Sequence, residues 1–272
     1  MTKQVLLSAM QEAARLAGRA IMSYYRPEGA DPQDVSYKGR DNPLTLADLE
    51  ANRILREALL AADPAAGWLS EESVDDAARL SCRRVWVVDP MDGTKEFVKG
   101  IPQFAVSIGL VEDGLPVGAC IYNPALDEMF TAWRGEGGHC NGQPLRVSQR
   151  GALAGASCLA SRSETGRGEW SDFQDRLQLH IMGSIAYKLA LLASGRYDLT
   201  FTLTPKNQWD FCAGLLLVEE AGGRVTDKQG ASFRFNGAEV RIQSLLATNG
   251  HLHSSLLELL RDTPLSPDRH VH

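Results

Sequence analysis

The chain is organised around the segment Val85-Trp86-Val87-Val88-Asp89-Pro90-Met91-Asp92-Gly93-Thr94-Lys95-Glu96-Phe97. Its first four residues are apolar and mostly β-branched, which predicts a buried strand. Proline fixes φ and lacks a backbone N–H, so the strand's ladder should end at the proline. The glycine permits a bend, and Thr94 is expected to cap a short helix over Lys95–Lys99. Two carboxylates, Asp89 and Asp92, are thereby placed at the end of a strand and beside a helix N-terminus.

The donor atoms of this segment suit a hard cation. Asp89 and Asp92 offer only oxygen, with no Cys or His nearby, and Mg²⁺ is commonly held by a few carboxylates together with substrate phosphate. One alternative is an ordinary Asp-rich turn. The nucleophile loop of haloacid dehalogenases is another, but its aspartates are two residues apart and these are three apart. An EF-hand is excluded because its loop needs further oxygen ligands at alternate positions.

Composition limits the classes of protein to which the chain can belong. With 272 residues it can hold one large domain or two modest ones, and 44% hydrophobic residues suffice for a core. The net charge of −6 argues against binding a nucleic-acid polymer or an acidic membrane. We see no run that approaches the ~20 apolar residues of a membrane span, and no signal-peptide pattern. Five scattered cysteines without Cys-x-x-Cys fit reduced thiols, so we expect a cytoplasmic protein.

Hydrophobic periodicity predicts a first half of two helices and an antiparallel sheet. Helices are expected over residues 2–25, with Thr2 as the cap, and over residues 43–62. The polar stretch before Asn42 is expected to be a loop or a hairpin. Strand patterns follow at residues 67–73, 85–88, 104–111, 117–122 and 128–133, with Asp-Gly, Asn-Pro and Asn-Gly turn signals after the last three.

The second half alternates strands and helices, which favours an α/β arrangement. Strands are expected at residues 157–161 and 245–248, and helices at residues 170–177, 183–194, 209–220 and 251–261. We therefore predict a fold with an α+β N-terminal domain over residues 1–153 and an α/β C-terminal domain over residues 154–263. A loose tail is expected over residues 264–272.

Three more carboxylates lie at expected strand ends or helix starts. Asp48 follows Thr45 with the spacing of a capping box, so serving its own helix is the simpler role. Glu71 belongs to an acidic pair of a kind that is usually a solvated loop. Asp210, in Gln208-Trp209-Asp210-Phe211-Cys212-Ala213-Gly214, is by itself explained as a first-turn helix acid. Taken singly, none of the three indicates a metal site.

Taken together, these segments resemble the inositol monophosphatase family of Mg²⁺-dependent, lithium-sensitive phosphatases. The family's G/S-E-E segment matches Ser70-Glu71-Glu72, its D-P-x-D-G-T-x-x-F matches Asp89–Phe97, and its W-D-x-x-A-G matches Trp209–Gly214. Its early T-x-x-D matches Thr45–Asp48. The resemblance extends from the first helix to about residue 260. It implies the layered αβαβα sugar-phosphatase fold.

The resemblance also implies a role for each matched residue. Two to three Mg²⁺ ions would be held by Glu71, Asp89, the Met91 carbonyl, Asp92 and Asp210, with Asp89 shared by the two main ions. Asp48 and Thr94 would orient and help deprotonate the attacking water, and Glu71 would complete the catalytic set by supporting a third, weaker ion through water. The phosphate would bind the backbone N–H groups of Gly93 and Thr94.

The rest of the substrate would contact a second group of residues. The resemblance places Gly183-Ser184 against its non-reacting part, and Ser161-Arg162 is expected to border the same pocket. Lys188, one turn further on, either reaches an anion or faces solvent, and we slightly favour solvent. Lys206 either binds a second phosphate or is a solvated loop residue.

The choice of phosphate ester depends on two local signals. Lys95-Glu96-Phe97 resembles the CysQ-like 3′(2′),5′-bisphosphate nucleotidase branch, whereas inositol phosphatases more often carry Thr-Asn-Phe there. Those enzymes also place an acid shortly before Trp-Asp to grip sugar hydroxyls, and Thr200–Gln208 contains no carboxylate. We therefore predict hydrolysis of adenosine 3′,5′-bisphosphate.

Other functions stay open at this point. An inositol-1-monophosphatase or broad-specificity sugar phosphatase is the first alternative. A non-catalytic protein that binds a phosphorylated metabolite is the second. In each case the partner is a small phosphorylated molecule, and the chain is expected to be a monomer or a homodimer.

Overall fold

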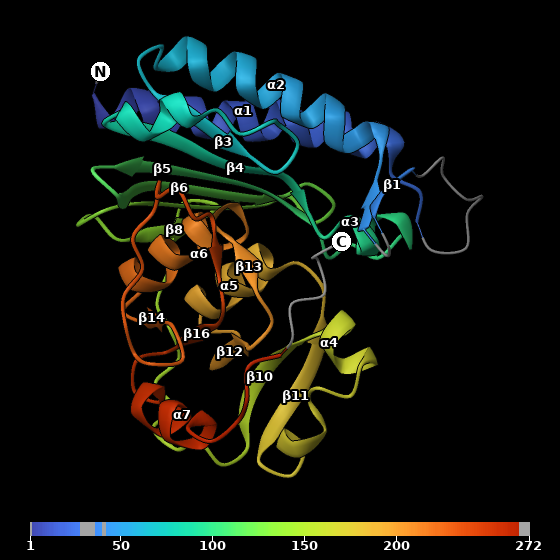
Figure 1. The fold of residues 1–272 in the computed structure, drawn as a ribbon, viewed down its shortest axis with the longest axis vertical. Coiled ribbons are helices and arrows are strands. Elements are labelled where there is room, and N and C mark those ends of the chain that lie inside the picture. The colour runs from blue at the N-terminus through green and yellow to red at the C-terminus, as the bar shows by residue number, and fades with distance from the viewer. Residues whose placement is uncertain (1, 28–35, 40–41, 267–272) are drawn as a thin grey trace.

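Helices and sheets alternate in five layers (Figure 1) in the computed structural model, which describes residues 2–27, 36–39 and 42–266. The α-helices are α1 (Lys3–Tyr24), α2 (Leu46–Ala62), α3 (Thr94–Val98), α4 (Arg162–Gly166), α5 (Ile185–Ala193), α6 (Gln208–Glu220) and α7 (His253–Leu260). Helices α1 and α2 cover one face of a seven-stranded sheet, and α5 and α6 pack between that sheet and a five-stranded one. Helix α7 packs on the outer face of the five-stranded sheet. This is the αβαβα layering that the resemblance implies.

The seven-stranded sheet is buried on both faces. Its order is β3 (Gly67–Ser70), β4 (Arg84–Asp92), β5 (Ala105–Glu112), β6 (Leu115–Asn123), β7 (Glu128–Trp133), β8 (Gly138–Cys140) and β9 (Gln143–Pro144). In β4, Trp86 and Val88 pack with α1 and α2, whereas Val85 and Val87 pack with α5 and α6. Alternate residues of a strand lie on opposite faces, so four apolar residues in a row fit a strand between two helical layers.

Strand directions in this sheet place the site. β3 pairs with β4 in parallel, and the other neighbouring strands are antiparallel. The predicted antiparallel sheet is therefore confirmed apart from its edge strand β3. Because parallel strands end at the same edge, the residues that follow β3 lie beside the end of β4.

The five-stranded sheet is mixed. Its order is β11 (Leu177–Met182), β10 (Ala156–Ser161), β12 (Leu199–Thr202), β16 (Leu245–Thr248) and β14 (Arg224–Thr226). β10 is parallel to β11 and β12, and β16 is antiparallel to β12 and β14. Two small antiparallel pairs are β1 (Ser36–Gly39) with β2 (Asn42–Leu44), and β13 (Lys206–Asn207) with β15 (Arg241–Ile242). The first pair is a hairpin in the predicted polar stretch, of which residues 28–35 and 40–41 lie outside the described part.

One predicted helix is absent from the described chain. Residues 170–177 contain only a 3₁₀ turn, Ser171–Phe173, before β11 begins. Trp170 and Phe173 stack against Phe201, with ring centroids 4.4 and 5.1 Å away. Tertiary packing of these rings overrides the helix-like spacing of the apolar residues.

One predicted cap is also wrong. Gly93 is the N-cap residue of α3, and Thr94 is its first helical residue. Thr2 occupies the predicted N-cap position of α1, but its side chain makes no capping hydrogen bond. In contrast, the predicted cap of α5 is confirmed, since the Ser184 hydroxyl accepts a hydrogen bond from the Tyr187 N–H.

The C-terminal segment is ordered further than predicted. The Ser266 backbone N–H donates to the Leu203 carbonyl (2.9 Å), and its hydroxyl donates to Glu169 (3.0 Å). Residues 267–272 of the predicted tail lie outside the described residues, and the domain division after residue 153 stays a prediction. Within the part of the chain that the structure describes, helices are too short or too polar to cross a membrane.

Candidate active site

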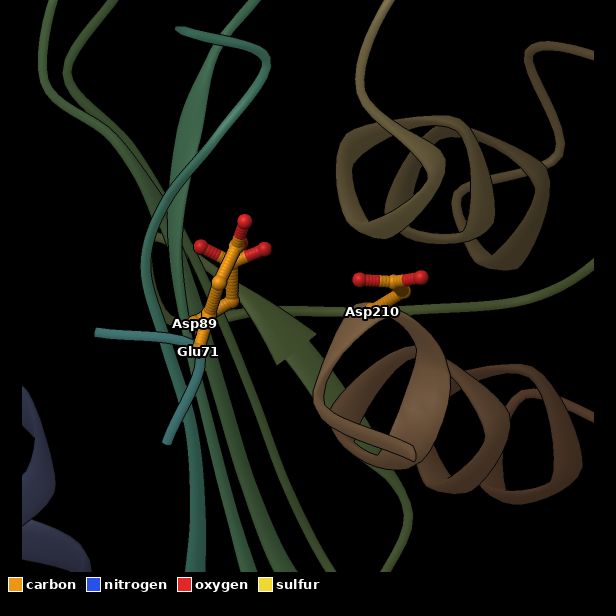
Figure 2. Close-up of side chains that lie close together, drawn as sticks. All are labelled: Glu71, Asp89 and Asp210. Carbon is orange, nitrogen blue, oxygen red and sulfur yellow. The ribbon is translucent and has the colours of Figure 1, made fainter. Parts of the chain in front are cut away.

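Three carboxylates from different elements meet at the ends of β3 and β4. Ser70, the last residue of β3, is paired with Val88 of β4, so Glu71 lies beside Asp89. Asp210 approaches from the first turn of α6 (Figure 2). One oxygen of each of these carboxylates lies within 4.8 Å of the other two. Glu71 and Asp210, which are weak signals when taken singly, thus form one group with Asp89 of the central segment.

Burial and mutual repulsion make this group costly in the absence of a cation. Burial raises the pKa of Asp89 well above its usual value, and the neighbouring charges of Glu71, Asp92 and Asp210 raise it further. Burial, together with Asp92 and Glu71, raises the pKa of Asp210 to about 8. A divalent cation would neutralise these charges. Because every donor is a carboxylate oxygen, the residues fit Mg²⁺.

Asp92 lies near this group but has additional partners in the structure. Its Oδ2 accepts hydrogen bonds from the Ser184 hydroxyl (2.7 Å) and from the Ala186 N–H (2.6 Å). These partners belong to the start of α5, and burial nonetheless raises the Asp92 pKa to about 6. Asp92 therefore connects the carboxylate group to the helix that carries Ser184.

Asp48 caps its own helix, as weighed in the sequence, and it also contacts Thr94. It forms the capping box of α2 with Thr45, whose N–H donates to Asp48 Oδ2 at 2.7 Å. Its other oxygen, Oδ1, lies 3.0 Å from the Thr94 hydroxyl, which also lies 3.1 Å from the Met91 carbonyl. Burial raises the pKa of Asp48, and the hydrogen bonds from Thr45 and Thr94 oppose that shift. The cap therefore fixes a carboxylate that faces Thr94.

The turn between β4 and α3 requires glycine. Gly93 has φ of +100°, and a Cβ there would lie 2.6 Å from the Gln103 carbonyl oxygen. Both the left-handed conformation and this close approach exclude a side chain. The first N–H groups of a helix have no partner within the helix, so the turn leaves donors beside Asp89 and Asp92.

Asn52 is part of the site's framework, although the sequence did not single it out. It lies one turn after Asp48 on α2, and its amide donates to the Glu72 carbonyl (3.1 Å). Its carbonyl oxygen accepts from the Ser70 hydroxyl (2.8 Å). Asn52 thus holds the residues on both sides of Glu71. The spacing of four residues from Asp48 is the signal that could have revealed it.

The carboxylates line one side of a cavity of about 440 Å³. The rest of the lining includes charged and small residues outside this group: Glu96, Ser161, Arg162, Gly183, Ser184, Lys188, Lys206 and Arg241. All the predicted substrate-side positions therefore border the cavity that the carboxylates enter.

Lys188 does not face solvent, so the role that we slightly favour for it from the sequence is wrong. The residue is only 2% exposed, because α5 lies between the two sheets and is buried along its whole length. Lys206 lies 3.3 Å from Glu164, a buried acid of α4. Lys206 is therefore an ion-paired residue of the cavity wall rather than a solvated loop lysine.

A model of the inositol monophosphatase family matches residues 2–265. The chain belongs to the inositol monophosphatase family. It is 36% identical over 270 residues to the inositol-1-monophosphatase of Rhizobium meliloti, covering 96% of this chain and 98% of the relative. It is 31% identical to the fructose-1,6-bisphosphatase/inositol-1-monophosphatase of Thermotoga maritima, covering 80% of this chain and 82% of the relative. The solved structure of the extragenic suppressor protein suhB of Bartonella henselae is also similar, with a TM-score of 0.81, 34% identity, and coverage of 94% of this chain and 98% of that one.

Membership makes the chain a metal-dependent phosphatase. The names of these relatives favour the inositol-phosphatase alternative over our first prediction of a bisphosphate nucleotidase. The Lys95-Glu96 signal was therefore a poor guide to the branch of the family.

Proposed function

We propose that the chain hydrolyses inositol 1-phosphate and related polyol or sugar monophosphates in a Mg²⁺-dependent reaction. The observation that carries the proposal is the group of Glu71, Asp89 and Asp210 in a cavity that Thr94 also lines, with the Thr94 hydroxyl 3.0 Å from the buried carboxylate of Asp48. The carboxylate group offers a binding site for cations and phosphate, and Asp48 offers a proton acceptor. The five cysteines are free, which supports a cytoplasmic location.

In this proposal the carboxylates are ligands of metal ions. Two Mg²⁺ ions would be held by Glu71, Asp89, the Met91 carbonyl, Asp92 and Asp210, and a third, weaker ion would depend on Glu71. Bound Mg²⁺ lowers the pKa of a coordinated water and offsets the charge of the phosphate oxygens. Asp92 already accepts two hydrogen bonds at Oδ2, so Oδ1 is the oxygen that it would offer.

The protein's own groups then orient the reaction. Thr94 positions the attacking water, and Asp48 accepts its proton through the Thr94 hydroxyl or directly. The backbone N–H groups of Gly93 and Thr94 hold the phosphate oxygens. A bond forms between the water oxygen and phosphorus, and the ester P–O bond breaks. The leaving oxygen takes up a proton from solvent and departs as the alcohol, and Asp48 returns the proton it accepted to solvent.

A second candidate substrate has its own support. The cations Arg162, Lys188 and Lys206 line the same cavity as the carboxylate group, and cations can bind a second phosphate. Adenosine 3′,5′-bisphosphate is therefore the runner-up. The partners Glu96 and Glu164 weaken this case because they already neutralise Arg162 and Lys206.

Phosphate release with Mg²⁺ across four substrates tests the proposal: inositol 1-phosphate, fructose 1,6-bisphosphate, NADP and adenosine 3′,5′-bisphosphate. We expect kcat/KM to be highest for inositol 1-phosphate or for the sugar phosphate. A preference of about 100-fold for the nucleotide, which is roughly 2.7 kcal/mol in the transition state, would reject the polyol assignment. Release from none of them would favour a non-catalytic binding protein. Inhibition by millimolar Li⁺ is expected if the weaker ion site is present.

A further inference from the structure

Glu96 is a buried carboxylate in the wall of the cavity. It lies in α3, two residues after Thr94, and is 5% exposed. The Arg162 Nε lies 3.3 Å from Glu96 Oε1. Apart from its own backbone N–H, we find no hydrogen-bond donor to the Glu96 carboxylate among the described residues. Glu96 therefore keeps acceptor capacity on the cavity side.

Lys188, in α5, is a hydrogen-bond donor in the wall of the same cavity, whereas Glu96 is an acceptor. Its ammonium borders the same cavity, and within the described chain no hydrogen bond from it is found. Its interactions with Glu164 and Asp92 are purely those of nearby charge. A nearly fully buried ammonium with unused donors is costly unless a ligand supplies acceptors.

Several other polar groups of this wall already have partners. The Gly183 N–H donates to Gln103 (3.3 Å), whose amide oxygen also accepts from Arg162 (2.8 Å). The Ser184 hydroxyl donates to Asp92. These bonds make the wall a preformed surface.

A hydroxyl group has the hydrogen-bonding capacity that suits both Glu96 and Lys188. It can donate its proton to a carboxylate and accept from an ammonium. A second phosphate could only accept, and Glu96 would repel it. Both residues line the same cavity, and the Glu96 carboxyl group packs against Gly183, five residues before Lys188.

We infer that Glu96 and Lys188 form a subsite for hydroxyl groups of the substrate's polyol. Inositol phosphatases more often place an acid that binds sugar hydroxyls shortly before Trp-Asp, and Thr200–Gln208 has no such acid. In this chain Glu96 would take its place. Glu96 and Lys188 would thus be specificity-determining residues, and the inference rests on the proposed function. Glu96 belongs to the tripeptide Lys95-Glu96-Phe97, on which the prediction of a nucleotide substrate rests. We instead assign this residue to binding substrate hydroxyls.

A pair of substrates that differ only in hydroxyls tests the subsite. Inositol 1-phosphate carries ring hydroxyls, and cyclohexyl phosphate has the same ring size without them. We expect E96A to lower kcat/KM for inositol 1-phosphate at least about tenfold, since a hydrogen bond to a charged group is lost. Hydrolysis of cyclohexyl phosphate should change less than about threefold, because that substrate does not use the subsite. K188M should show the same selective loss.

Controls separate the subsite from a structural effect. E96Q keeps the side-chain shape and should give an intermediate loss, and E57A on the exposed face of α2 should leave both substrates unchanged. An equal fall for both substrates would overturn the inference, because Glu96 would then merely position α3. A loss in K188M confined to adenosine 3′,5′-bisphosphate would also overturn it. If the wild-type protein hydrolyses cyclohexyl phosphate but shows no preference for inositol 1-phosphate, the proposed function fails and the inference fails with it.

Discussion

The two sides of the cavity are built in opposite ways. On one side Glu71, Asp89 and Asp210 bring like charges together within 4.8 Å, and burial raises the pKa of the two aspartates. On the other side each cation has an acid nearby, as in the pair of Arg162 with Glu96. The first side is complete only with a cation, whereas on the second side two of the cations, Arg162 and Lys206, are already paired with acids before any ligand binds. Chemistry and substrate choice should therefore respond to different mutations.

The largest effect is expected for Asp89→Asn. Asp89 is the carboxylate on which both proposed ions depend, so kcat should fall by roughly 1,000-fold. The metal-free protein should instead become more stable, because one of several repelling charges is removed. Thermal unfolding in EDTA and phosphate release with Mg²⁺ measure the two quantities.

In Asp89→Asn, kcat must fall while the stability of the metal-free protein rises. The amide oxygen of the substituted asparagine can still accept the Met91 N–H that now donates to Asp89 Oδ1 (3.0 Å), so the turn should survive. Mg²⁺ should raise the melting temperature of the wild-type protein much more than that of the variant. Activity above a tenth of wild type would reject the shared-ligand role.

Asp48→Asn should come next, with a fall in kcat of about 100-fold and little change in the Mg²⁺ requirement. Proton transfer by a positioned base contributes on this scale, and Asp48 holds Thr94 without belonging to the close carboxylate group. Asparagine keeps an oxygen for the capping box, so the stability of α2 should change little. An unchanged kcat would leave Asp48 as a capping residue only.

Asn52→Ala should have a smaller effect, on metal binding rather than on chemistry. Groups that orient metal ligands typically influence affinity by 10- to 100-fold. We expect the Mg²⁺ concentration for half-maximal rate to rise about tenfold, with kcat at saturating Mg²⁺ within about twofold of wild type. The rise in melting temperature on adding Mg²⁺ gives a second readout. If E57A, on the same helix, shifts the Mg²⁺ requirement equally, the hydrogen bonds of Asn52 to Glu72 and Ser70 are not the cause.

The sequence was a good guide to the carboxylate side, because short motifs place each acid at the end of an element. Asp89 follows an apolar strand, and Asp210 opens a helix, so local rules predict where their backbones lie. The meeting of Glu71 with Asp89 needs one further fact, the parallel pairing of β3 with β4. Family resemblance implied that Glu71 and Asp89 serve the same metal site, but the parallel pairing itself is known only from the structure.

The opposite side depends on contacts that local rules do not contain. The charge of Lys188 alone predicts an exposed side chain, yet α5 is enclosed by two sheets. Glu96 resembled a branch marker, but its position against Gly183 is tertiary: a Cβ on Gly183 would overlap the Glu96 carboxyl group. The predicted helix over residues 170–177 is wrong for the same reason, since Trp170 packs on Phe201 from another strand.

The smallest predicted effect lies away from both sides of the cavity, at His253 in α7. Its ring nitrogens contact the hydroxyls of Thr226 (2.8 Å) and Thr248 (3.1 Å), and burial together with Arg224 lowers its pKa to about 4. In the unfolded chain the histidine binds a proton near pH 6.5, so the native protein loses stability as the pH falls from about 6.5 toward 4. Between about pH 7.5 and pH 5, the wild-type melting temperature should fall a few degrees more than that of His253→Gln. The carboxylate group titrates in both proteins and cancels in the difference. Parallel curves for the two proteins would show that acid sensitivity belongs to the carboxylate side alone.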